Sequence, residues 1–282
     1  MKNILIATDF SNNAYNALFY ATKLFENHNC SFHILNAYTE HTPLKSNCQA
    51  AGRNLSLLQQ LGEESMEGLY AFLHRINLDT ANSKHHFGIH SKNQNLVDAL
   101  QHAIKETNAD LVVMGNKGKT GAKSIFLASN VIKSINAIKD CPILTIPGEK
   151  EFVLPKEIAF ATDYKKNYNA KVLQPLRIFA SYCDSSVCIV HINEEERLSP
   201  VQKSNLYTLR EYLGPIKHSI HWMPDFANKT RAITDFIDEL GIDMLVMIHY
   251  EHGFLEKLTR EPVLEKVSFN INIPFLILPY SD

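Results

Sequence analysis

A basic, glycine-rich segment in the first half of the chain is the clearest candidate for binding chemistry. Residues 114–123 read MGNKGKTGAK and follow directly on an apolar run. The glycines at 115, 118 and 121 allow backbone N–H groups to approach a ligand closely, because glycine lacks a Cβ and tolerates positive φ. Three lysines, at 117, 119 and 123, make this segment basic in a chain whose formal net charge is only -2. These residue types favour a polyphosphate ligand.

A hydroxyl residue follows the glycine segment where a helix is expected to begin. After residues 124–127 the sequence continues Ala128-Ser129-Asn130. Ser129 is suited to cap that helix and to offer its hydroxyl and neighbouring N–H groups to a phosphate. The chain contains no G-x-x-x-x-G-K-[ST] motif, which excludes a P-loop ATPase. Because no dedicated base for water activation is evident, we expect slow or absent hydrolysis and assign no catalytic residue.

An acidic residue stands at the end of the first predicted strand. Residues 3–11 read NILIATDFS, so that the apolar run meets Asp9. In an open parallel sheet, ligands bind beyond the carboxyl ends of strands where the strand order reverses. That crevice is expected between the ends of the first and fourth strands, opposite the glycine segment. The alternative is that Asp9 only helps to start the next helix, together with Ser11.

The chain contains one strand pattern twice. Four segments match in the same order: NILIATDFS with EIAFATDYK, SFHILNAY with SVCIVHIN, ADLVVMG with IDMLVMI, and DCPILTIP with NIPFLILP. Such ordered matches indicate an internal duplication. The boundary falls in the charged stretch PGEKEFVLP, which is bracketed by two prolines. The sequence therefore predicts domains at residues 1–148 and 149–282.

Segments with helical periodicity separate the predicted strands. Residues 12–28 place apolar side chains at i, i+3, i+4 and i+7, the spacing of one buried helix face. The strands are uninterrupted apolar runs such as residues 111–114, as is typical of strands that helices cover on both faces. Strands that alternate with helices form right-handed crossovers and a parallel sheet. The expected fold is α/β, with two tandem, doubly wound, parallel five-stranded sheets of Rossmann-like type.

The motifs of the first repeat resemble those of one family. The spacing Gly115-x2-Gly118-x9-Ala128-Ser129 resembles the G-x2-G-x9-G-S/T motif of universal stress proteins, with Ala128 where that family usually has glycine. The strand ending Ala-Thr-Asp-Phe-Ser and the closing Cys-Pro-x-Leu-x-x-Pro segment also resemble this family. The resemblance extends over both repeats. It implies an adenine nucleotide alpha hydrolase-like fold, a stress-response or regulatory role, and ATP as ligand, with or without Mg²⁺.

The resemblance also implies which residues contact the nucleotide. Asp9 would contact the ribose or adenine side, and the backbone of Ala37 would meet the adenine edge. The glycine segment and the residues that follow it would cradle the phosphates. The complete set of residues expected at the site is Ala7, Asp9, Ala37, Met114, Gly115, Gly118, Lys119, Gly121, Ala128, Ser129 and Asn130.

The second repeat lacks the phosphate-binding glycines. In the alignment, Gly115, Gly118, Ala128 and Ser129 correspond to Ile248, Glu251, Glu261 and Pro262. Acidic side chains at these places would repel phosphate oxygens, and proline has no N–H to donate. The second domain is therefore expected to be a degenerate copy that does not bind ATP by this route.

Family members commonly pair through their last strands. The resemblance therefore implies that residues 143–146 and 275–278 pair across an internal pseudo-two-fold axis, which would cover two sheet edges. The chain would then form an intramolecular pseudo-dimer, and a further homodimer or an unidentified protein partner stays open. Two other functions also stay open: an interaction scaffold that binds no nucleotide, and a slow ATPase or nucleotidyl-transfer enzyme, for which no HIGH-type motif is present.

Composition excludes several other classes. Hydrophobic residues make up 45% and charged residues 21%, the balance of a globular protein. No long basic tract predicts a nucleic-acid partner, and no run approaches the ~18 apolar residues of a membrane-spanning helix. The N-terminus lacks the pattern of a signal peptide, so we expect a cytoplasmic protein. The cysteines form no CxxC pair and are expected to be reduced, mostly buried thiols: Cys30, Cys48, Cys141, Cys183 and Cys188.

Histidine pairs give only weak indications of a metal site. His249-x-x-His252 has no identifiable remote ligand in the sequence. His85 and His86 are adjacent in a predicted strand, so their side chains point to opposite faces. No metal ligand is therefore assigned.

Overall fold

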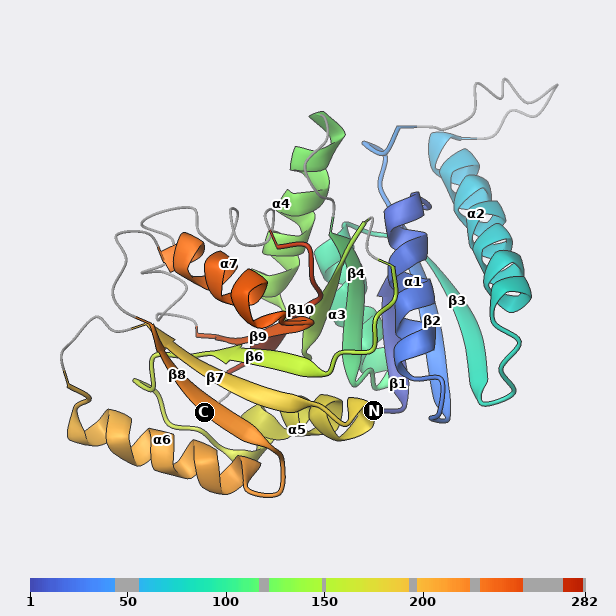
Figure 1. Ribbon diagram of the computed structural model, residues 1–282. Helices are drawn as coiled ribbons and strands as arrows, with labels where there is room; N and C mark the ends of the chain where they lie inside the picture. Colours follow the sequence, from blue (N-terminus) through green and yellow to red (C-terminus); the bar gives the residue numbers. More distant parts are fainter. Residues whose placement is uncertain are drawn as a thin grey trace. The chain divides into compact units, whose positions relative to one another are not determined.

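Strands and helices alternate along the chain, as the apolar periodicity predicts. The computed structural model (Figure 1) describes residues 1–43, 56–116, 122–148, 151–192, 197–223, 229–250 and 271–280. The chain divides into two compact units, Met1–Gly115 (unit 1) and Asn116–Asp282 (unit 2). No described helix is long and apolar enough to cross a membrane.

Unit 1 contains a parallel sheet with the strand order β3-β2-β1-β4. Ile4 of β1 lies between Phe32 of β2 and Leu111 of β4. All three side chains are fully buried, which fits a sheet that helices cover on both faces. Its elements are β1 (Asn3–Ala7), α1 (Asn12–Leu24), β2 (Cys30–Tyr38), α2 (Leu57–Asp79), β3 (His85–Asn93), α3 (Leu96–Thr107) and β4 (Leu111–Asn116).

Polar side chains set the ends of the helices in unit 1. The Ser11 hydroxyl caps α1 by accepting a hydrogen bond from the Ala14 N–H. Asn95 caps α3 in the same way, and that helix ends at Asn108 in the left-handed conformation, with φ 49°. These residues satisfy N–H and C=O groups that a helix end leaves unpaired. The sequence thus fixes where each helix begins relative to the strand before it.

Unit 2 contains a mostly parallel sheet with the strand order β5-β10-β9-β6-β7-β8. The segments predicted to pair, 143–146 and 275–278, lie in β5 and β10, which pair antiparallel with Leu276 opposite Leu144. Its elements are α4 (Ala122–Ala137), β5 (Ile143–Pro147), β6 (Glu157–Ala161), α5 (Ala170–Cys183), β7 (Ser186–Ile192), α6 (Pro200–Leu213), β8 (His218–Met223), α7 (Lys229–Leu240), β9 (Met244–His249) and β10 (Phe275–Pro279).

The predicted fold class is confirmed, because both repeats form α/β sheets from alternating strands and helices. The compact units do not follow the sequence repeat at every element. β5 ends the first repeat in sequence, yet it belongs to unit 2, where it pairs with β10. The domain boundary between residues 148 and 149 stays a prediction from the repeat.

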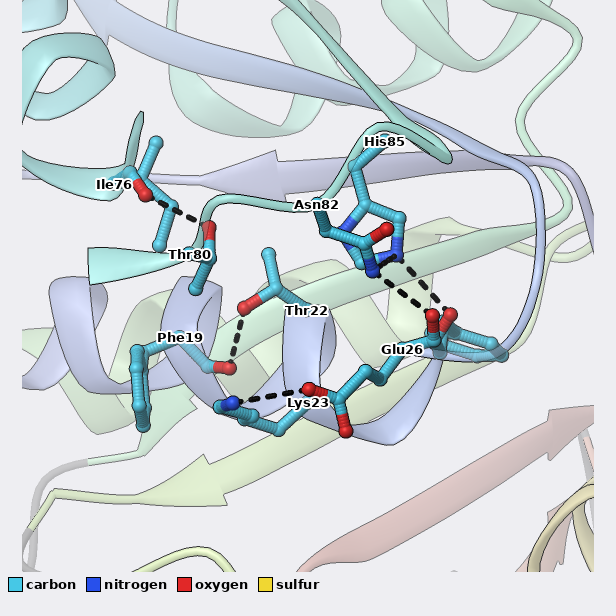
Figure 2. A network of polar contacts seen from close by, with 9 residues as sticks. Phe19, Thr22, Lys23, Glu26, Ile76, Thr80, Asn82 and His85 are labelled. Carbon is cyan, nitrogen blue, oxygen red and sulfur yellow. Dashed lines mark hydrogen bonds and ion pairs between the residues drawn. The ribbon is translucent and has the colours of Figure 1, made fainter. Parts of the chain in front are cut away.

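A polar network joins the end of α1 to the start of β3 (Figure 2). His85 Nε2 lies 3.1 Å from the Phe25 carbonyl oxygen, and Asn82 Nδ2 donates to the Glu26 carbonyl at 2.8 Å. The Thr80 hydroxyl donates to the Ile76 carbonyl at 2.7 Å. Each such bond stabilises the folded state by about 1 kcal/mol, and more where its loss would leave a buried carbonyl unpaired.

Burial lowers the pKa of four histidines in unit 1 below the ordinary value of 6.5. Burial disfavours the charged imidazolium, so the folded state holds these rings neutral. The histidines are His28, His33, His85 and His90, and the charged or titratable groups that act on them are the N-terminus, Glu26, Lys84, His86, Lys92 and Glu106.

We expect the free energy of unfolding to decrease as the pH falls below about 6.5, since the unfolded chain then binds more protons than the folded chain. Above that pH the contribution is fully present. Thermal unfolding at a series of pH values between about 7.5 and 5.5 measures this slope. His85→Gln should reduce the slope, because it removes one of the four rings that folding holds neutral. A stability that stays constant or rises on acidification would contradict the assignment.

Candidate functional site

Hydrogen bonds join the carboxyl ends of β1 and β2 in unit 1. The Thr8 N–H donates to the Leu35 carbonyl at 2.9 Å, which continues the parallel ladder by one residue. The buried Asn36 side chain donates from Nδ2 to the Thr8 carbonyl at 2.8 Å. Together these bonds fix the direction in which the chain leaves β1.

A tight turn follows at Asp9. Phe10 has φ 64°, a left-handed conformation that costs about 1–2 kcal/mol for a residue with a side chain. Three bonds hold the turn: Phe10 N to Thr8 Oγ1 at 2.9 Å, Ser11 N to Asp9 Oδ1 at 2.9 Å, and Ala14 N to Ser11 Oγ at 3.2 Å. Asp9 therefore helps to start α1 together with Ser11, which is the structural role considered as the alternative to ligand binding. Its side chain is nevertheless exposed at the edge of the sheet.

The end of β4 lies against the start of α1. A Cβ added at Gly115 would lie 2.8 Å from the Asn13 carbonyl oxygen and 3.1 Å from the Ala14 nitrogen. Backbone atoms cannot move aside easily, so packing alone requires a glycine here. Met114 of β4 pairs in register with Ala7 of β1. The structure thus brings Ala7, Met114 and Gly115 together beside the Asp9 turn.

Helix α2 covers the aromatic residues at this edge. The Phe10 ring fits against Gly68, where an added Cβ would lie 2.6 Å from ring atom Cζ, and it makes an edge contact with Phe72 at 5.5 Å. The Tyr38 hydroxyl lies 2.9 Å from the position of a Cβ on Gly62. Two glycines on α2 therefore make room for two rings, one from the turn after β1 and one from β2.

Of the other expected site residues, the structure describes some and leaves others outside the described part of the chain. Ala37 lies two residues beyond Leu35, the partner of Ala7, so β2 extends past the end of β1. Gly118, Lys119 and Gly121 lie outside the described residues.

The prediction that a helix begins at residues 128–130 is wrong, since α4 begins at Ala122. Position 129 therefore lies inside the helix and not at its start. Residues 122–127 contain no helix breaker, and alanine at 128 is the residue most favourable to a helix interior. Asn130 lies in the same helix and is half-buried.

Unit 2 builds the same turn from the equivalent residues Thr162, Asp163 and Tyr164. Tyr164 has φ 57°, its N–H donates to Thr162 Oγ1 at 3.3 Å, and Lys165 N donates to Asp163 Oδ1 at 2.9 Å. His191 Nδ1 lies 3.0 Å from the Thr162 carbonyl, in the place of the Asn36 amide in unit 1. The Thr-Asp-aromatic turn is thus a property of both repeats.

Aromatic rings occupy this edge of unit 2. Tyr164 is fully buried and stacks on His191, with ring centroids 4.7 Å apart. Trp222 makes edge contacts with both rings. Gln202 and Asn205 of α6 donate to the Asp163 and Tyr164 carbonyls at 2.9 and 2.8 Å. Hydrogen bonds from α6 and ring contacts with His191 and Trp222 therefore hold the turn in unit 2.

The matching positions of unit 1 carry small polar residues. Asn36 takes the place of His191, and its register partner is Ser91, whereas the partner of His191 is Trp222. The Ser91 hydroxyl lies 2.8 Å from the Ser65 hydroxyl of α2. The two repeats therefore differ chiefly in the bulk of the side chains that surround the same turn.

The cysteines provide no reactive thiol among the described residues. Cys30, Cys141, Cys183 and Cys188 are free and buried. Burial raises the pKa of Cys30 and of Cys183 to about 11, which keeps both thiols protonated near neutral pH. Cys48 and His252 lie outside the described residues. Among those described, no group of three or more histidine, cysteine, aspartate and glutamate side chains is arranged around a metal position.

We expect Gly68→Ala to destabilise the protein by about 1–3 kcal/mol, because the added methyl group overlaps the Phe10 ring. The left-handed turn limits how far that ring can move. Urea unfolding followed by circular dichroism measures the change. Gly62→Ala is the matched control on the same helix, and its effect should be smaller because the flexible end of Tyr38 can move. Equal stability of wild type and Gly68→Ala would refute this packing.

Comparisons with known proteins identify related sequences and folds. A family model described as "Universal stress protein family" matches residues 1–147. A universal stress protein from Archaeoglobus fulgidus DSM 4304 has a TM-score of 0.70 and 15% identity, covering 99% of this chain and 97% of that chain. A putative universal stress protein from Pseudomonas aeruginosa UCBPP-PA14 has a TM-score of 0.57 and 12% identity, covering 99% and 93%. At these identities the structures show the fold alone. No curated protein sequence matches the chain.

Proposed function

The chain belongs to the universal stress protein family, and from this premise we propose that its first repeat binds ATP, with little or no hydrolysis, in stress-response regulation. The observation that carries this proposal is the contrast between the repeats. Both build the same turn after their first strand, but only unit 2 places rings from its second and third strands, His191 and Trp222, against it. Unit 1 carries Asn36 and Ser91 at the matching places.

The residues of unit 1 suit the base and sugar of a nucleotide. Ala7 and Ala37 have small side chains, which lets a planar base approach the backbone N–H and C=O groups at the strand ends. The exposed Asp9 carboxylate is a strong acceptor for ribose hydroxyl groups. Its bond from Ser11 N orients the carboxylate while leaving it at the surface.

The phosphates are assigned to the basic glycine segment. Lys119 and its neighbouring lysines supply positive charge, and the glycines at 118 and 121 supply accessible N–H groups. Ser129 is a weaker candidate than its spacing suggests, because an N–H inside a helix is bonded to the carbonyl four residues earlier. Without a P-loop motif or an evident base, the chemistry proposed is binding rather than turnover.

A second candidate function is an interaction scaffold that binds no nucleotide. Two observations favour it. Gly115 is required by its contact with the Asn13 backbone, and the Asp9 turn recurs at Asp163 in a repeat that lacks the glycines. Both residues therefore have structural roles that do not depend on ATP.

The first test is mass spectrometry of ligand released from the purified, denatured protein, followed by ATP titration of the emptied protein by calorimetry. We expect Asp9→Asn to weaken ATP binding about tenfold, equivalent to ~1.4 kcal/mol, because asparagine keeps the turn but removes the charge. Gly118→Leu should abolish binding by blocking the backbone of the glycine segment.

Asp163→Asn is the matched control, since it makes the same change in the same turn of unit 2. Its ATP affinity should equal that of the wild type. An emptied protein that ignores ATP would replace this proposal with the scaffold. Phosphate release well above the buffer background would overturn the part of the proposal that concerns hydrolysis.

A further inference from the structure

Two histidines meet on neighbouring strands of unit 1, away from the Asp9 turn. His33 of β2 and His90 of β3 place Nδ1 and Nε2 3.2 Å apart, with ring centroids separated by 5.3 Å. Both side chains are half-buried, so water reaches the pair. Lys92, two residues after His90 and on the same strand face, bonds to Glu106 of α3 at 2.7 Å. The pair therefore lies on the face of the sheet that α3 covers.

The separation of the two nitrogen atoms suits a shared metal ion. Zinc binds histidine nitrogen at about 2.0–2.1 Å, and two tetrahedral ligands at that distance are about 3.3 Å apart. The atoms that face each other in the structure are ring nitrogens, which are the metal ligands of a neutral imidazole. In the hydrogen-bonded pair one of these two nitrogens carries the proton, and metal binding requires that ring to adopt its other tautomer, with the proton on its remaining nitrogen.

Gly88 lies beside both nitrogen atoms. It is the register partner of His33. A Cβ at this position would lie 3.5 Å from His33 Nδ1 and 3.8 Å from His90 Nε2. The glycine therefore places no side chain of its own next to the two nitrogen atoms.

We propose that His33 and His90 form a two-histidine site for a borderline transition-metal ion such as Zn²⁺. Imidazole suits zinc, copper and nickel rather than magnesium or calcium. Because no third ligand is in place among the described residues, water completes the coordination and the ion exchanges readily. The site does not depend on the proposed nucleotide function.

The charges around the pair permit a cation. The Lys92 ammonium group disfavours positive charge at His90, but it is paired with the Glu106 carboxylate. That carboxylate favours positive charge at both histidines. Burial and, for His33, the neighbouring His90 lower the pKa of these rings, so both are neutral and able to bind a metal at pH 7.

Nuclear magnetic resonance of the full chain with ¹⁵N-labelled histidine rings tests this site during titration with Zn²⁺ at pH 7. We expect the His33 Nδ1 and His90 Nε2 signals to shift together with one binding isotherm. In calorimetry, His33→Gln and His90→Gln should each remove this binding step or weaken it at least about tenfold. His102→Gln, an exposed histidine on α3, is the control and should bind Zn²⁺ as the wild type does.

Acidification of the zinc-loaded wild type provides a test that needs no variant. Protons compete with the metal for both rings, so zinc should leave the pair as the pH falls toward about 5.5, and the two signals should return together. Histidine signals that respond to pH but not to Zn²⁺ would show a plain hydrogen-bonded pair and overturn the proposal. Glutamine variants that fold and bind this zinc ion unchanged would overturn it equally.

Discussion

The turn after the first strand of each repeat holds an aromatic residue in a left-handed backbone conformation, and the neighbouring elements are arranged around it. The conformation is costly for phenylalanine or tyrosine, so surrounding bonds must maintain it. A threonine hydroxyl, an aspartate carboxylate and a donor from the second strand do so in both repeats. The turn also directs the aromatic ring, which lies against Gly68 of α2 in unit 1 and stacks on His191 in unit 2.

The two repeats differ in what they place around this shared turn. In unit 2, α6 amides bond to the turn carbonyls, and a histidine and a tryptophan pack against Tyr164. In unit 1 the corresponding strand positions carry short polar side chains. A duplicated fold can therefore keep the same backbone while one copy fills its strand ends with rings. The proposal that only the first repeat binds ATP rests on this difference in side-chain bulk and not on a difference in topology.

Much of the fold was predictable because it depends on local pattern. Apolar runs and helical periodicity identified the alternation of strands and helices, and the repeated Ala-Thr-Asp-aromatic segment located both turns. The start of α4 was wrongly predicted, since the family spacing places the helix start at residues 128–130, whereas residues 122–127 and the alanine at 128 favour a helix that begins earlier. Long-range contacts were hardest to foresee. No periodicity indicates that Gly68 admits the Phe10 ring, or that His33 meets His90 from a strand far along the sequence.

The pairing of β5 with β10 has a consequence for synthesis of the chain. Leu144 and its partner Leu276 are separated by most of the second repeat, so β5 emerges from the ribosome long before the strand that will pair with it. At about 5–20 residues per second, this interval lasts on the order of ten seconds. During that time an apolar strand edge has no final partner, and such an edge can join a strand from another nascent chain. Translation speed through the second repeat thus becomes a factor in how much of the protein reaches its native state.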